Sequence, residues 1–185
     1  MANAALLKVG VGDHKGAAEA LEEFARRFPA DPDVETYFWI AGEQWALVGE
    51  EKALAFYRRY LDRFVDTNPD HTIEALHWIA DYSERAKNTR RAERGWEELM
   101  DRYNALVAAQ AEVGPRALNL VAQAAFRDVQ AGYDEYADIQ YPTDPAALAE
   151  YLTVTKLDGL QALVQTTLQF IQTYPDFEYS TAALY

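Results

Sequence analysis

The chain carries one segment twice, 39 positions apart. Residues 34–64 (VETYFWIAGEQWALVGEEKALAFYRRYLDRF) align with residues 73–103 (IEALHWIADYSERAKNTRRAERGWEELMDRY), and the unusual tripeptide Trp-Ile-Ala stands at 39–41 and again at 78–80. Internal similarity at a period of roughly 20 to 50 residues is typical of proteins built from stacked structural repeats. The sequence therefore predicts two similar units in succession.

Each copy has the pattern of two helices joined by a turn. In the second half of the first copy, apolar residues recur at spacings of 4, 3 and 4, at Ala53, Tyr57, Tyr60 and Phe64. Such a stripe is what a helix buries on one face. Small residues such as Ala41 and Ala53 are expected to let the two helices approach closely. Because no bounded run alternates apolar and polar residues, we expect an all-α fold.

An earlier copy of the second helix occupies residues 12–29. It contains the turn Gly12-Asp13-His14, then Ala17, Leu21 and Pro29. These residues match the second-helix pattern of the tetratricopeptide repeat (TPR) family, which this chain resembles. The resemblance implies a TPR-like right-handed α-solenoid of antiparallel helical hairpins, acting as a non-enzymatic scaffold that binds a partner peptide or helix on its concave face.

The match to the family departs at particular positions. Ile40-Ala41 and Ile79-Ala80 stand where the family has Leu-Gly, and larger residues, namely Phe24, Tyr60 and Leu99, replace its second small Ala. Packing between neighbouring repeats is therefore expected to differ from that of the family.

Repeat lengths of 36 and 39 residues and phrases such as FARRFP resemble the long TPRs of bacterial envelope proteins. These include outer-membrane assembly lipoproteins, Tol-Pal-associated coiled-coil proteins and gliding-machinery scaffolds. The resemblance implies a bacterial envelope or motility complex and a periplasmic location, with the cytoplasm as the alternative. No signal peptide is visible at MANAALLKV, and no apolar run of about 18 residues occurs.

We expect two regions, with repeats over 1–112 and a long helical hairpin plus the start of a further repeat over 113–185, together forming one continuous solenoid. The hairpin covers 115–174, with a turn at 142–145. Its first arm carries an apolar seam at Leu118, Ala122, Ala125, Val129, Gly132, Tyr136 and Ile139. Its return arm carries a second stripe at Leu157, Leu160, Val164, Leu168, Ile171 and Tyr174.

Both ends read as unpaired first helices, the tail of one at 2–9 and the start of another at 178–185. Solenoids normally finish with a polar capping helix. We therefore expect the chain to be a piece of a longer array. A third function is self-assembly, in which the helix ending at Tyr185 completes the groove of a neighbouring molecule.

Charge limits the partners. The net charge is −13, and residues 128–185 hold Lys156 against nine acidic groups. A surface this acidic repels phosphate backbones, so binding to nucleic acid or anionic membrane is disfavoured and a basic protein partner is favoured. The absence of cysteine excludes thiolate chemistry and disulfides.

The expected partner site lies on two successive first helices. An aromatic pair, Phe38 and Trp45, stands seven residues apart, and aromatic residues commonly anchor interfaces. Acidic and polar side chains beside this pair would suit a peptide that combines a hydrophobic anchor with Lys or Arg. The partner-binding residues expected on this basis are Glu35, Phe38, Trp45, Glu74, His77, Asp81 and Glu84.

A helical-bundle metal protein or enzyme is the alternative function. Glu74 and His77 have the Glu-x-x-His spacing that puts a carboxylate and an imidazole on one helical face. Di-iron sites need a second such motif. His14 does not supply it, because Val11 and not a glutamate stands three residues before it. We therefore expect Glu74 and His77 to be exposed polar groups, and no metal, cofactor or catalytic residue is predicted.

The basic stretch 84–94 (ERAKNTRRAER) could contact phosphate or an acidic segment. We expect instead a solvated turn, in which arginines pair at helical spacing with nearby glutamates. The arginines are Arg90, Arg91 and Arg94, and the glutamates are Glu93, Glu97 and Glu98.

Overall fold

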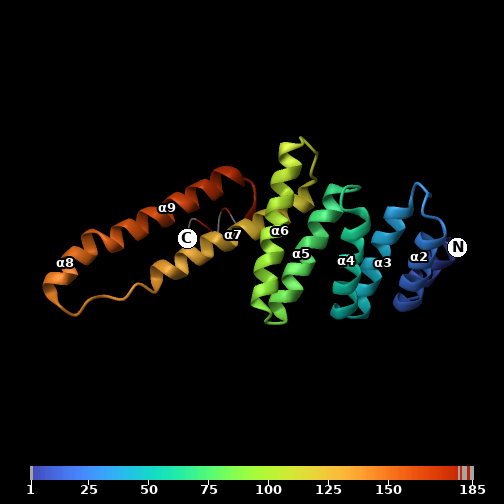
Figure 1. Ribbon diagram of the computed structural model, residues 1–185, viewed down its shortest axis with the longest axis horizontal. Helices are drawn as coiled ribbons and strands as arrows, with labels where there is room; N and C mark the ends of the chain where they lie inside the picture. The colour runs from blue at the N-terminus through green and yellow to red at the C-terminus, as the bar shows by residue number, and fades with distance from the viewer. Residues whose placement is uncertain (1, 179, 181–182, 184–185) are drawn as a thin grey trace. The chain divides into compact units, whose positions relative to one another are not determined.

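The computed structural model describes residues 2–178, 180 and 183. Over these residues the chain is all-helical, as predicted, with nine α-helices and no strand (Figure 1). They divide into two compact units between Ala117 and Leu118. Most of the further helix predicted at 178–185, with Tyr185, lies outside the described residues.

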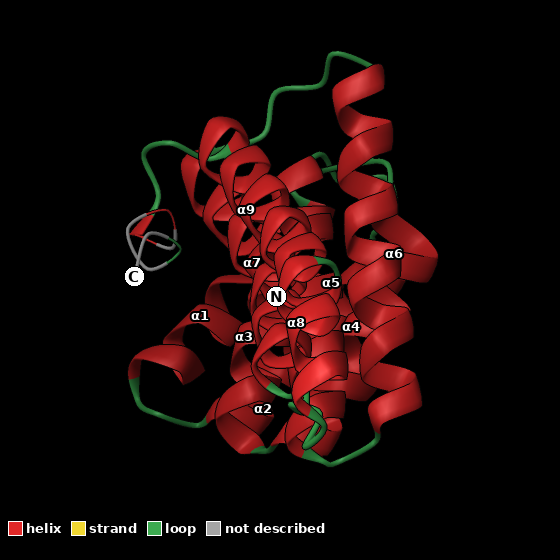
Figure 2. Cartoon of the chain, turned by 90° about the vertical axis from the view of Figure 1, so that its left-hand side faces the viewer, coloured by secondary structure: helices red, strands yellow, loops and turns green. Residues whose placement is uncertain are grey.

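The first unit is a succession of helices in which each packs against the next one in the chain (Figures 1 and 2). The repeated segment 34–64 forms α3 and α4, and 73–103 lies within α5 and α6. The helices are α1 (Ala2–Gly10), α2 (His14–Arg27), α3 (Val34–Val48), α4 (Glu50–Phe64), α5 (Pro69–Arg85) and α6 (Thr89–Ala108).

Local sequence signals set where these helices begin. The Asp13 carboxylate caps α2 by accepting the N–H of Gly16 at 3.0 Å, and Gly12 takes a φ of +77° in the turn before it. Asn68 caps α5 ahead of Pro69, which occupies the first helical turn. These are the positions at which Asn or Asp, Pro and Gly satisfy or avoid unpaired backbone groups.

Small residues allow close helix contact in both repeated pairs. In the first pair, a Cβ added to Gly42 of α3 would lie 2.7 Å from the ring of Phe56 on α4. In the second pair, a Cβ on Gly95 of α6 would lie 3.0 Å from the Cα of Ala80 on α5. Phe56 and Gly95 occupy the same repeat position. The glycine at the close contact therefore lies on the first helix of the first pair and on the second helix of the second pair.

The second unit contains α7 (Pro115–Ala137) from Leu118 onward, α8 (Pro145–Thr153) and α9 (Thr155–Thr173). α9 lies alongside α7 (Figure 1), with the rings of Phe126 and Phe170 5.6 Å apart. The Lys156 ammonium donates to the Tyr136 carbonyl at 3.0 Å. The predicted return arm is thus two helices, because the helix is interrupted at Val154.

The register of the return arm differs from the prediction. Six of the seven predicted seam residues lie on α7 and the seventh, Ile139, lies just after it, and all seven are buried or half-buried. On α9, however, four of the predicted stripe residues are 41–51% exposed, namely Leu157, Leu160, Val164 and Leu168. The side that meets α7 carries Gly159, Leu163 and Phe170 instead, with Ile139 Cδ1 3.3 Å from a Cβ built on Gly159.

None of the described helices combines the length and the apolar character that crossing a membrane requires.

Candidate functional site

A surface cleft of about 540 Å³ lies between α2 and α4, with α3 beneath it. Its floor contains Phe38 and Trp45, the aromatic pair singled out from the sequence, both less than 9% exposed. Its walls are charged, with Glu19, Glu22, Glu23 and Arg26 on α2 and Arg59 and Arg63 on α4. An apolar floor between polar walls is the usual composition of a binding cleft.

Glu22 connects the three helices around this cleft. Its carboxylate accepts the indole N–H of Trp45 from α3. The Arg59 guanidinium on α4 donates to both oxygens of the same carboxylate, at 2.9 and 3.0 Å. A single acidic side chain therefore closes the cleft over its aromatic floor.

The remaining wall charges of the α2–α4 cleft are also satisfied within the molecule. Arg63 donates to the carbonyl of Ala25 at 3.0 Å and lies over the Phe38 ring, 5.6 Å from its centroid. Hydrogen bonds from Arg26 and Arg27 lower the pKa of Glu23. This cleft is thus neutralised by its own ion pairs.

A second cleft, of about 740 Å³, recurs one repeat further along, between α4 and α6 with Ile79 of α5 on its floor. Three of its wall residues, Arg58, Asp62 and Glu98, occupy positions that also line the first cleft, with the charges reversed. Glu22 of the first cleft corresponds to Arg58 at an offset of 36, and Arg59 corresponds to Glu98 at an offset of 39. No ion pair joins Arg58 and Glu98 in the described chain.

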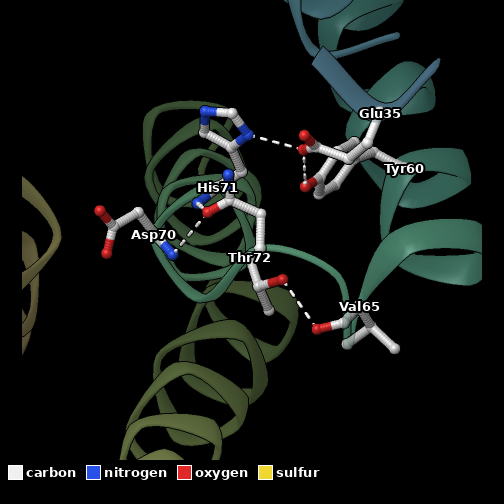
Figure 3. Close-up of polar contacts among 7 residues, drawn as sticks. Glu35, Tyr60, Val65, Asp70, His71 and Thr72 are labelled. Atoms are coloured by element: carbon white, nitrogen blue, oxygen red, sulfur yellow. Dashed lines mark hydrogen bonds and ion pairs between the residues drawn. The ribbon is translucent and has the colours of Figure 1, made fainter. Parts of the chain in front are cut away.

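Glu35, one of the predicted partner-binding residues, is instead buried at the junction of α3, α4 and α5 (Figure 3). Its carboxylate accepts the Tyr60 hydroxyl and the His71 Nδ1–H, each at 2.6 Å. The His71 ring stacks on Trp39, with centroids 4.2 Å apart. Burial raises the pKa of Glu35, but the bonds from His71 and Tyr60 outweigh it, so the pKa lies below its ordinary value.

The same junction is held by the start of α5. The Thr72 hydroxyl donates to the Val65 carbonyl at 2.9 Å, and the Asp70 N–H donates to Asn68 at 3.1 Å (Figure 3). His71 is therefore fixed in a capped first turn. The arrangement joins three helices and buries the carboxylate of Glu35.

Glu74 and His77 are buried, at 5% and 4% exposure, which corrects the expectation that they are exposed polar groups. Glu74 pairs with Arg116 at 2.8 Å. Burial nevertheless raises the pKa of Glu74. The pair does not offset this effect, because solvent reaches most of the Arg116 side chain and screens the interaction. His77 packs edge-on against the rings of Trp78 and Trp96.

A metal site at Glu74 and His77 gains no support from the geometry. The described residues hold no group of three or more potential metal ligands among His, Asp and Glu. The Glu74 carboxylate is directed to Arg116, as its ion pair shows.

The last two predicted partner-binding residues lie near the end of α5. Asp81 pairs with Arg85 at 2.9 Å, and Arg85 also pairs with Glu50 of α4. Glu84 is exposed. Of the seven predicted residues, Phe38 and Trp45 line the α2–α4 cleft, whereas Glu35, Glu74 and His77 are buried and line neither of the two clefts described above.

The ion pairs expected for Arg90, Arg91 and Arg94 are wrong. None of the three makes an ion pair with a residue that the structure describes, and all three line the α4–α6 cleft. The three arginines lie on the side of α6 that faces the cleft. Of the glutamates expected to pair with them, Glu98 lines this cleft, whereas Glu93 and Glu97 do not.

The sequence reasoning did not single out His71, Glu22 or Arg59. The position of His71 could have been noticed from the sequence. His71 is the third residue of a capped helix, and the first turn of that helix should contact the preceding helical pair. The charge reversal between Glu22 and Arg58 was also visible at the repeat offset. Their contacts, however, join residues 23 to 37 positions apart, which no local pattern reports.

No family model, curated protein or solved structure matches the chain.

Proposed function

We propose that the chain is a non-enzymatic protein-protein interaction scaffold, a TPR-like right-handed α-solenoid of antiparallel helical hairpins. The observation that carries this proposal is a cleft that recurs between successive second helices of the pairs, between α2 and α4 and again between α4 and α6. Repeated units that each contribute one cleft form an extended binding surface. Packed helices lose little conformational entropy when a partner segment docks on them.

The partner segment docks in the α2–α4 cleft, with an apolar anchor directed at Phe38 and Trp45. To reach this floor, the anchor displaces the pair between Glu22 and Arg59. Arg59 is half exposed, and such pairs contribute only about 0–1 kcal/mol, so the opening is cheap. Once freed, the two side chains can bind polar groups of a peptide or helix.

The acidic excess of the chain favours a partner with basic regions. The resemblance to long TPRs supports a bacterial envelope or motility complex as the setting.

Affinity capture tests the proposal. The chain is immobilised, and proteins retained from an extract of the encoding organism are quantified by mass spectrometry, in parallel with Trp45→Ala and Arg59→Ala variants. Trp45→Ala removes the floor of the cleft and also core volume, whereas Arg59→Ala alters only the wall. Circular dichroism reports whether each variant is folded.

We expect at least one protein that is retained by the wild-type chain and lost from both variants. Retention that is equal on all three folded chains would dismiss the α2–α4 cleft as the site. If the wild-type chain retains nothing above an unrelated helical protein, the scaffold function itself is excluded.

A further inference from the structure

The α4–α6 cleft contains a cluster of arginines that outnumber its acidic residues. Four arginines line it, Arg58, Arg90, Arg91 and Arg94, and none makes an ion pair with a described residue. Other arginines of the first unit lie within 2.9 Å of a carboxylate oxygen, namely Arg26, Arg27, Arg59, Arg85, Arg102 and Arg116. Arg63 makes no ion pair either, but it donates to the Ala25 carbonyl, whereas no side-chain hydrogen bond to a described residue satisfies the four cleft arginines.

The fold holds these charges together from two helices. Arg58 extends half-buried from α4, and the other three lie on the first turns of α6. Asn88 caps α6 by accepting the N–H of Arg91 at 3.3 Å, so the positive end of the helix dipole adds to the same region. Burial and the nearby charge of Arg91 lower the pKa of the Arg58 guanidinium.

We infer that the α4–α6 cleft binds an acidic peptide segment of a partner protein, whose carboxylates pair with Arg58, Arg90, Arg91 and Arg94. The planar guanidinium donates two parallel hydrogen bonds to a carboxylate, which makes arginine the residue best suited to this recognition. The inference rests on the proposed scaffold function and assigns the second cleft its ligand.

The other lining residues favour a peptide over a phosphate polymer. Asp62 and Glu98 stand in the same cleft and would repel closely spaced phosphates, but they can accept backbone N–H groups of a peptide. Leu61 and Ile79 supply apolar surface for aliphatic side-chain atoms.

Fluorescence anisotropy with a labelled synthetic peptide of alternating Glu and Ala tests the inference on the full chain. The variant combines Arg91→Glu with Arg94→Glu. Both positions are exposed near the start of α6. Acidic residues there are stabilised by the positive end of the helix dipole, so this variant should fold. The matched control combines Lys15→Glu with Arg27→Glu, on exposed positions of α2 that line neither cleft, and changes the net charge equally.

We expect the peptide to bind the wild-type chain and the control alike, and to bind the cleft variant at least about tenfold more weakly, since each charge-assisted bond contributes on the order of a tenfold change in affinity. Equal binding to the variant overturns the inference. So does tighter binding of single-stranded RNA or inorganic phosphate than of the peptide.

Light scattering of the same chains distinguishes a second copy as the ligand. If the wild-type chain self-associates and the cleft variant does not, the acidic residues of another copy occupy the cleft and the inference of a separate partner is wrong. The capture experiment reports separately on the α2–α4 cleft. Loss of peptide binding in Arg91→Glu/Arg94→Glu with unchanged capture by Trp45→Ala and Arg59→Ala would sustain the inference while removing the proposed docking site.

Discussion

Arg63 and Arg102 stand 39 positions apart and make the same kind of contact. Arg63 donates to the carbonyl of Ala25 in the last turn of α2, and Arg102 donates to the carbonyl of Val65 just after α4, at 3.0 and 2.7 Å. Each guanidinium therefore lies at the C-terminal end of the second helix in the preceding pair. The last carbonyls of a helix lack intrahelical partners and carry partial negative charge, which a cation stabilises.

Arg102→Ala should therefore lower the free energy of unfolding by about 1–2 kcal/mol, the usual cost of removing a partner from a charged hydrogen bond. Urea unfolding at neutral pH measures the change. Arg90→Ala is the matched control, since Arg90 is exposed and its side chain makes no hydrogen bond with a described residue, and we expect a change within about 0.5 kcal/mol. An equal effect of both substitutions would mean that the contact to Val65 contributes nothing to stability.

The helices of the repeated region could be predicted because their signals are local. α3 begins at Val34 and α4 ends at Phe64, the limits of the repeated segment, and Asn68 with Pro69 marks the start of α5. Spacing, caps and turn residues all act within one or two helical turns.

The environments of Glu35 and Glu74 could not be predicted in this way. Both occupy one repeat position, and both are buried. Their partners differ, because Glu35 meets His71 and Tyr60, whereas Glu74 meets Arg116. These partners are 25 to 42 positions away, so their identity depends on tertiary packing.

The register of α9 failed for a different reason. Apolar residues lie on two sides of this helix, and the spacing does not say which side is buried. The structure turns Gly159, Leu163 and Phe170 toward α7, where Gly159 admits Tyr136 and Ile139 within 3.3 Å of the space a Cβ would fill. Close approach at a glycine decides the side.

Leu163→Ala should destabilise the second unit by about 2–3 kcal/mol, since its side chain packs toward α7 close to Gly132. Leu160→Ala, on the exposed side of the same helix, should change stability by no more than about 0.5 kcal/mol. Thermal or urea unfolding of both variants compares the two sides. The reverse order of effects would restore the stripe predicted from sequence.

Glu35→Gln should lower the free energy of unfolding at pH 7 by about 1–3 kcal/mol, because it weakens the bonds from His71 and Tyr60 in a buried site. The folded-state pKa of Glu35 lies below the ordinary glutamate value of 4.5. Its stabilising contribution is therefore present above pH 4.5 and is lost as the pH falls through the folded-state pKa. Urea unfolding of wild type and variant at a series of pH values should show the difference shrinking below pH 4.5.

Glu74→Gln should have the opposite sign, raising stability at pH 7 by up to about 1 kcal/mol. Burial raises the folded-state pKa of Glu74, so the charged form is disfavoured in the fold and stability falls as the pH rises from 4.5 through that pKa. The lost pair with the exposed Arg116 offsets little of this gain. Urea unfolding of the Glu74→Gln variant over the same pH series measures this change. A loss of stability at pH 7 comparable to that of Glu35→Gln would contradict the raised pKa of Glu74.

Ala80→Leu tests the close contact between α5 and α6. Ala80 is fully buried, and the Cβ position of Gly95 lies 3.0 Å from its Cα, so the added atoms must displace the backbone of α6. Overpacking of this kind costs about 1–3 kcal/mol. Ala55→Leu adds the same atoms at an exposed position of α4 and should leave stability within about 0.5 kcal/mol. Similar urea midpoints for the two variants would show that the helices separate without cost, and the tight packing of the second repeated pair would then be wrong.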